Sequence, residues 1–131
     1  MTRINHELIQ KELIRAEHAL KAAQKLLEVE LLADAISRAY YACLHSAKAA
    51  LLTQGVTVLS HKAVITLFGQ HLVQTGKIEK EYGRVLREEQ EDREVGDYDV
   101  FEIIELGRAN QRVSDAQQFV KRMGEFVQKT P

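Results

Sequence analysis

The sequence predicts an all-α fold in a single domain, residues 1–131, in which a short helix lies between two long helix pairs. Three observations support this prediction. Long segments repeat apolar residues every three or four positions, as amphipathic helices do. No segment alternates apolar and polar residues with period two, so no sheet is expected. The only Pro is the terminal Pro131, so no helix is interrupted by one.

The segment Leu31–Gln54 is the predicted central helix. It contains no Gly or Pro and is rich in Ala and Leu, the residues that lose least on becoming helical. Apolar residues occur on nearly every side of it, which is typical of a helix surrounded by other helices. Gly55 follows its last turn, where a left-handed cap is easiest for Gly.

Four further helices follow from the same periodicity. They are predicted over residues 5–29, 61–73, from 78 to a break at 96–99, and 100–127. Ser60 is the predicted N-cap of the short one, and Asp99 with Glu102 has the form of a capping pair for the last. We therefore expect the fifth helix to begin directly after the break.

The segment from Arg87 to Glu94 contains no apolar residue. We expect a solvated helical extension or part of a polar interface there. Opposite charges four residues apart support the helix. The predicted pairs are Arg84 with Glu88, Arg87 with Glu91, and Glu89 with Arg93.

Charge and cysteine content limit the class of protein. The net charge is −1, and residues 79–99 hold nine acidic side chains against four basic ones, which argues against a general nucleic-acid coat but permits a local basic patch. A single Cys, Cys43, suits a reducing compartment. Because no apolar run is long enough for a signal peptide or a membrane span, we expect a cytoplasmic protein with no membrane contact.

Arg38, Tyr41 and His45 are the main candidate functional residues. They fall within about 60° of one another around the central helix, so one narrow strip carries a guanidinium, a phenol and an imidazole. A cation inside a bundle has to be paired, reach water or serve a purpose. The structural interpretation is that Arg38 pairs with Asp34 or Asp97 inside the ring of helices, while the other two complete a polar layer.

Several motifs resemble one known family. Ser37–Ala42 (SRAYYA), Gly55, Ser60–Lys62 (SHK) and Arg93–Tyr98 (REVGDY) resemble, in order and spacing, the HEPN family, the higher eukaryote and prokaryote nucleotide-binding domains. The similarity extends from about residue 7 to about residue 125. It implies an up-and-down bundle of four to five helices, usually a homodimer. It also implies nucleotide or RNA binding and a minimal nucleotidyltransferase partner in a toxin–antitoxin arrangement.

Many HEPN proteins are metal-independent ribonucleases that carry an Arg, four to six residues, then His. At the corresponding place this chain has Arg93 followed by Asp97 and Tyr98, with no His. Arg38 and His45 fit the spacing on an earlier helix, and either this pair or Arg38 with Arg93 across a dimer interface is the alternative, catalytic hypothesis. Arg93 and Asp97 are four residues apart, so an intrahelical salt bridge explains them equally well.

The predicted ligand-binding set has seven members. The residues are Arg38, Tyr41, His45, Lys62, Arg93, Asp97 and Tyr98. Lys62, next to His61 at a helix start, lies where free backbone N–H groups can hold a phosphate. The five histidines show no metal-ligand spacing, and no phosphate-binding Gly motif occurs, so we expect no metal and no cofactor.

Overall fold

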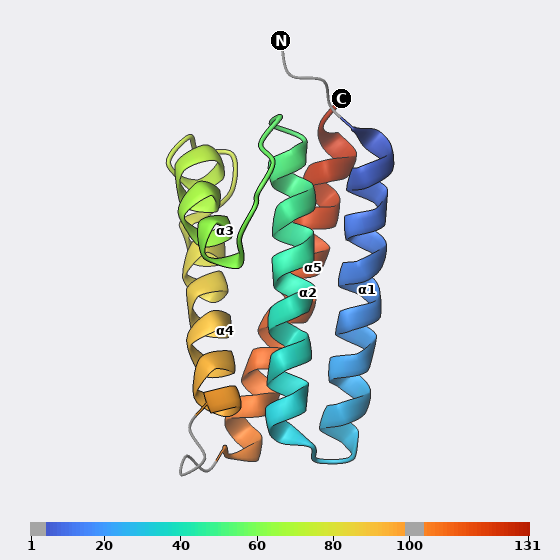
Figure 1. Cartoon of the computed structure of the whole chain (residues 1–131), viewed down its shortest axis with the longest axis vertical. Coiled ribbons are helices and arrows are strands. Elements are labelled where there is room, and N and C mark those ends of the chain that lie inside the picture. Colours follow the sequence, from blue (N-terminus) through green and yellow to red (C-terminus); the bar gives the residue numbers. More distant parts are fainter. Residues whose placement is uncertain (1–4, 99–103) are drawn as a thin grey trace.

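A computed structural model describes residues 5–98 and 104–131, and these form five α-helices, one π-helical turn and no strand. The elements are α1 (His6–Glu28), α2 (Leu32–Leu52), α3 (His61–Phe68), η1 (Gly69–Val73), α4 (Lys80–Tyr98) and α5 (Leu106–Lys129). In Figure 1, α1 and α4 run in one direction, whereas α2 and α5 run in the other. The predicted all-α bundle is confirmed.

Helix α2 is the centre of the bundle, as its composition predicts. It packs against α1, α3, α4 and α5, and thirteen of its 21 residues are buried. Figure 1 shows it between α1 and α4, with α5 behind. Its buried positions are mostly Ala and Leu, and the small Ala side chains let neighbouring helices approach closely on several sides.

The α1–α2 pair is capped at its start by Asn5, which was not predicted as a cap, and at its end by Gly55, which was. The side chain of Asn5 accepts a hydrogen bond from the backbone N–H of Leu8 at 3.0 Å, which satisfies one of the free donors at the start of α1. Gly55, just beyond α2, has a φ angle of 73°, a left-handed conformation that Gly adopts without steric cost.

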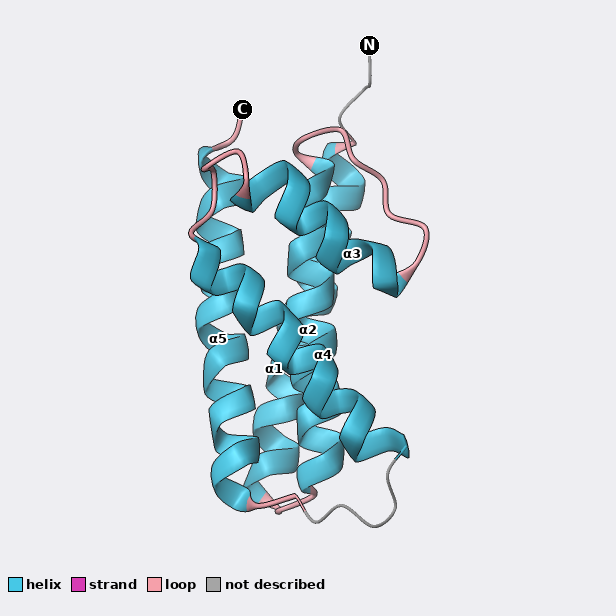
Figure 2. Cartoon of the chain, turned by 90° about the vertical axis from the view of Figure 1, so that its left-hand side faces the viewer, coloured by secondary structure: helices cyan, strands magenta, loops and turns pink. Residues whose placement is uncertain are grey.

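The short third helix is confined to the end of the bundle where α1 begins and α5 ends (Figure 2). Ser60 caps it by accepting from the N–H of Ala63 at 3.3 Å, as predicted. The helix continues directly into the wider turn η1, in which Gln74 donates to the carbonyl of Gly69 at 2.8 Å. Phe68 anchors the unit to α5, its ring centroid 5.6 Å from that of Phe119.

The predicted break at residues 96–99 is wrong, because α4 continues through Gly96 to Tyr98. A Gly inside a helix costs only about 1 kcal/mol, so it need not end one. Here Gly96 permits close packing: a Cβ on it would lie 3.1 Å from Ile104 and 3.7 Å from Ala33 of α2. Helix α5 begins at Leu106 rather than at residue 100, and the predicted capping pair lies outside the described residues.

The polar segment of α4 is not a simple solvated extension. Of the three predicted charge pairs, Arg84–Glu88 forms, at 3.3 Å. Glu89 is instead fully buried, and Arg93 pairs with Asp97 at 3.0 Å. The reason is helical period, since position 89 follows buried Leu86 by three residues and so faces the core with it.

Within residues 5–98 and 104–131, no helix combines the length and the hydrophobicity that a membrane crossing requires.

Candidate functional site

Tyr41 is the centre of a cluster that joins α2 to α4. The guanidinium carbon of Arg38 lies 5.3 Å from the centroid of its ring, and that of Arg93 lies 5.6 Å from the same centroid. Both distances fall within the range of cation–π attraction. Arg93 also donates a hydrogen bond to the phenol oxygen of Tyr41 at 3.2 Å. The structure therefore brings together two arginines that are 55 positions apart in the sequence.

Arg93 is the anchored member of the pair. Its side chain is 18% exposed, forms an ion pair with Asp97 at 3.0 Å and lies 5.4 Å from the ring centroid of Tyr40. Of the two interpretations of Arg93 and Asp97, the intrahelical salt bridge is present. It also aims the guanidinium at Tyr41. Tyr98 ends α4, and its side chain lies outside the described residues.

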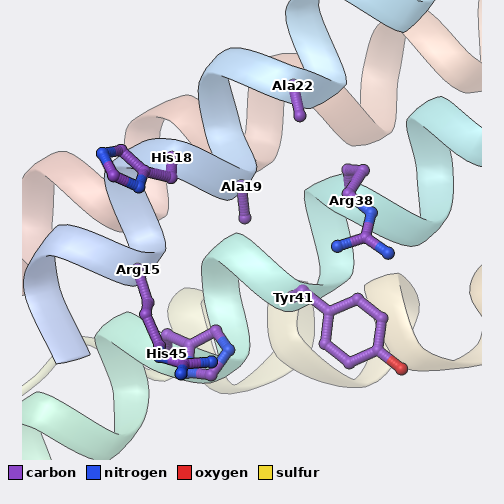
Figure 3. Close-up of a pocket in the computed structure, with 7 residues that line it drawn as sticks. All are labelled: Arg15, His18, Ala19, Ala22, Arg38, Tyr41 and His45. Carbon is purple, nitrogen blue, oxygen red and sulfur yellow. The ribbon is translucent and has the colours of Figure 1, made fainter.

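Arg38 contradicts the expectation that it is held inside the bundle. Its side chain is exposed, and within the described residues it pairs with neither Asp34 nor Asp97. The reason lies on α1, which presents the short side chains of Ala19 and Ala22 here. They leave space through which the guanidinium reaches water, and Figure 3 shows it directed toward the ring of Tyr41.

This space is a cleft of about 570 Å³ between α1 and α2. We call it the Tyr41 cleft, and Figure 3 shows its lining residues. They are Arg15, His18, Ala19, Ala22, Arg38, Tyr41 and His45. Its volume lies in the range of small-ligand sites. All three members of the predicted strip therefore face one cavity.

Glu12 holds His45 in place within the Tyr41 cleft. The carboxylate Oε2 of Glu12 lies 2.9 Å from Nδ1 of His45, and its Oε1 lies 4.0 Å from Nζ of Lys48. Burial alone would raise the pKa of Glu12, but the hydrogen bond from His45 and the charges of Lys48 and Arg15 outweigh it, and the pKa is lowered. An ionised Glu12 orients the imidazole through Nδ1–H and so leaves Nε2 as the acceptor.

His61 adds an aromatic edge to the cluster. Its ring centroid lies 5.9 Å from that of Tyr41, in an edge-on arrangement. Burial, together with the charges of Lys48 and Arg93, lowers the pKa of His61, so its imidazole is neutral at neutral pH. Lys62, predicted to bind phosphate, is exposed on the first turn of α3 and is not among the residues that line the cleft.

The balance of charge in this region is positive. Four permanent cations, from Arg15, Arg38, Lys48 and Arg93, stand against the carboxylates of Glu12 and Asp97. Guanidinium groups bind phosphate through paired N–H donors, and a phenol ring offers a surface on which a base can stack. Among the described residues, no group of three or more His, Cys, Asp or Glu is placed to hold a metal ion.

Some members of the site were missed by sequence reasoning. Lys48 follows His45 by three residues, so it extends the strip of Arg38 and Tyr41, and this spacing was a usable signal. Glu12 could not be predicted as the partner of His45, because the contact joins two helices across 33 positions. The spacing from Ile9 and Ala16 does place Glu12 at the border of the buried face of α1, but it does not identify the partner.

Comparison with known proteins agrees with this architecture. The HEPN domain profile matches residues 9–130. A Methanocaldococcus jannaschii protein named "Putative toxin MJ0605" is 40% identical over 117 residues, 89% of this chain and 87% of that protein. A UPF0332 protein of Gloeobacter violaceus is 37% identical over 87% of this chain and 86% of its own length. A UPF0332 protein of Pyrococcus horikoshii is 41% identical over 66% of this chain and 61% of its own. The chain belongs to the HEPN domain family.

Proposed function

We propose that this protein is a toxin-like HEPN module that binds single-stranded RNA or a nucleotide in the Tyr41 cleft and acts with a minimal nucleotidyltransferase partner. The observation that carries the proposal is the placement of Arg38 and Arg93, from different helices, over one phenol ring. One guanidinium is anchored by a carboxylate, while the other is exposed and has no ion pair within the described residues. An exposed guanidinium beside an aromatic ring suits a phosphate next to a stacked base.

Charge distribution favours a short single-stranded ligand over a duplex. The cleft is basic, but α4 carries exposed carboxylates at Glu91 and Glu94 that would repel the backbone of a long nucleic acid. A cleft of about 570 Å³ has room for a nucleotide or a short stretch of single strand. Binding is therefore confined to one or a few nucleotides at a time.

The proposed partner is supported by the family resemblance and by exposed apolar side chains on the surface. A relative with "toxin" in its name aligns with 89% of this chain. The HEPN resemblance implies a homodimer and a separately encoded nucleotidyltransferase. Val29 and Leu31, in the α1–α2 turn, and Leu106, at the start of α5, are large apolar side chains exposed at one end of the bundle. The other exposed large apolar side chains of the described residues, Leu8, Ile14 and Leu59, lie elsewhere, so this end carries three of the six, a group that suits a contact with protein.

The test of RNA binding is fluorescence anisotropy with a labelled ten-nucleotide single-stranded RNA. Arg38→Ala is expected to weaken binding about tenfold, since a charged hydrogen bond to phosphate contributes about 1.5 kcal/mol or more. The matched control is Lys121→Ala, an exposed cation on α5 outside the cleft, which is expected to leave affinity unchanged. Equal affinity in wild type and Arg38→Ala would refute the site.

The partner is tested by co-expression. A nucleotidyltransferase encoded in a neighbouring reading frame is expected to co-purify with this chain at a fixed ratio. Separate elution of the two proteins on size exclusion, at micromolar concentration, would contradict the proposed partnership without touching the RNA site.

A second function, metal-independent RNA cleavage, is favoured by one observation, the hydrogen bond that His45 donates to Glu12 in the same cleft as Arg38. A carboxylate-oriented imidazole can take the proton of a 2′-hydroxyl, and a guanidinium can stabilise the pentavalent phosphorus that follows. RNA incubated in EDTA would then be cut by wild type and left intact by His45→Ala and Arg38→Ala. If the wild type leaves the RNA intact in this assay, the second function is refuted.

A further inference from the structure

A second cavity lies between the α3–η1 unit and α4, on the side of the bundle away from α1 (Figure 1). We call it the α3–α4 pocket. Its volume is about 350 Å³, and it shares no lining residue with the Tyr41 cleft. It is lined by Ile65, Gly69, Val73, Lys80, Glu81, Gly83, Arg84 and Arg87.

The floor of the α3–α4 pocket is apolar, and glycine backbone forms part of it. Ile65 and Val73 are partly buried aliphatic side chains, and the two glycines present no side chain at all. A Cβ on Gly69 would meet nothing within 4 Å, and one on Gly83 would touch only Val73, at 3.5 Å. The π-helical turn η1 starts at Gly69, and such turns occur frequently at functional sites.

The rim of the pocket is cationic. Lys80, Arg84 and Arg87 are exposed and stand at intervals of four and three residues, which places them on one face of α4. Arg84 forms an exposed ion pair with Glu88, at 3.3 Å. Within the part of the chain that the structure describes, no carboxylate lies in ion-pair distance of Lys80 or Arg87. One acidic residue, Glu81, lines the pocket against these three cations.

The surroundings limit the size of the anion that this rim accepts. Lys80 and Arg87 are about 10 Å apart along the helix axis. Beyond them, Glu91 continues the same face of α4 with a negative charge, and Glu88 borders it. A long polyanion that followed the cations would meet these carboxylates, so only a compact anion fits.

We propose that the α3–α4 pocket is a binding site for a small amphipathic anion, whose phosphate or carboxylate group is held by Lys80, Arg84 and Arg87 while its apolar body rests on Ile65, Val73 and the two glycines. The volume is at the lower end of small-ligand sites, which are concave, mostly apolar and equipped with a few polar groups. The inference is independent of the function proposed for the Tyr41 cleft.

The test is an NMR titration of the ¹⁵N-labelled full chain with phenyl phosphate as the amphipathic probe. Inorganic phosphate supplies the head group alone and benzyl alcohol the apolar body alone. Saturable shifts are expected at the amides of Gly69, Val73 and Gly83 with phenyl phosphate, at a concentration at least about tenfold below that needed with either half-probe. Equal affinity for inorganic phosphate, or shifts confined to the Tyr41 cleft, would overturn the proposal.

Two variants separate the rim from the floor. The double variant Arg84→Gln/Arg87→Gln is expected to lose about tenfold in affinity, whereas Lys121→Gln/Lys129→Gln, with the same change in net charge on exposed α5 positions, is expected to lose none. Gly69→Leu places a side chain in the empty space and is expected to abolish binding. Undiminished binding in the double Gln variant refutes the site even if Gly69→Leu does not fold.

Discussion

Two carboxylates face α2 from opposite sides of the bundle, and they are in opposite states. Glu12 on α1 is 9% exposed, and its partners His45 and Lys48 lower its pKa. Glu89 on α4 is 0% exposed, and neither of its oxygens has a hydrogen-bond partner within the described residues. Burial raises the pKa of Glu89 to about 9, although the charge of Arg112 opposes the shift.

The comparison separates a side of the bundle where side chains are ionised and reach water from a side where a carboxylate is buried and neutral. On the α1 side, ionised groups line a cleft that is open to water. On the α4–α5 side, Glu89 is neutral at neutral pH, and Arg112 is held by Asp92 at 3.3 Å and by Asp115 at 3.1 Å. The first arrangement suits a ligand, whereas the second suits the alignment of two helices.

The largest expected effect is at Glu89. Because its folded pKa is above its unfolded value, its protonated form stabilises the fold below about pH 4.5, and this stability is lost as pH rises through about 9. Glu89→Gln removes the titration, so the free energy of unfolding of the variant relative to wild type is expected to rise by about 3 kcal/mol between pH 5 and pH 7. Urea denaturation at each pH measures it.

The control for Glu89 is Glu91→Gln, two positions along the same helix on an exposed side chain. It is expected to show no such dependence on pH in this range. If the free energy of unfolding of Glu89→Gln varied with pH in parallel with that of the wild type from pH 5 to pH 8, Glu89 would be ionised in the core.

The opposite dependence is expected at Glu12. Its lowered folded pKa means that the carboxylate stabilises the fold above its unfolded pKa, and that this stability is lost as pH falls through the folded value. Glu12→Gln is expected to lower the free energy of unfolding by about 1.5 kcal/mol at pH 6, since a hydrogen bond to a charged group is lost, and by progressively less as the pH falls and Glu12 of the wild type is protonated. A deficit that does not shrink as the pH falls would assign the effect to packing.

The smallest expected effect is at Tyr41. Tyr41→Phe removes the acceptor for Arg93 but keeps the ring near both guanidinium groups, and is expected to cost about 0.5–1 kcal/mol of stability while RNA affinity stays within about twofold. Tyr41→Leu removes the ring as well, and is expected to weaken RNA binding by about tenfold. Equal RNA affinity of the Phe and Leu variants would show that the ring contributes nothing.

Periodicity and composition sufficed for the parts of the fold that depend on local pattern. The central helix and the shared face of Arg38, Tyr41 and His45 follow from 3.6 residues per turn, and the cap at Gly55 follows from the ease with which Gly adopts a positive φ. Gly96 misled the prediction because a Gly inside a helix is cheap, and here it leaves room for the side chain of Ile104. Local pattern cannot distinguish a Gly that ends a helix from a Gly that lies within one.

The remaining features depend on which helices become neighbours. The spacing of Glu89 from Leu86 points inward, but the polar segment that contains Glu89 offers no apolar position to show that another helix covers the face that far. The exposure of Arg38 depends on the small side chains of Ala19 and Ala22 on another helix. The Glu12–His45 contact likewise exists only once α1 lies against α2.

The most direct test of the Tyr41 cleft as the RNA site is crosslink mapping. Single-stranded RNA that contains 4-thiouridine is irradiated with the wild-type protein, and the crosslinked peptides are identified by mass spectrometry. We predict crosslinks within α2 at or next to Tyr41, with loss of yield in Arg38→Ala. Crosslinks concentrated on residues 80–87 of α4, or unchanged yield in Arg38→Ala, would contradict the account.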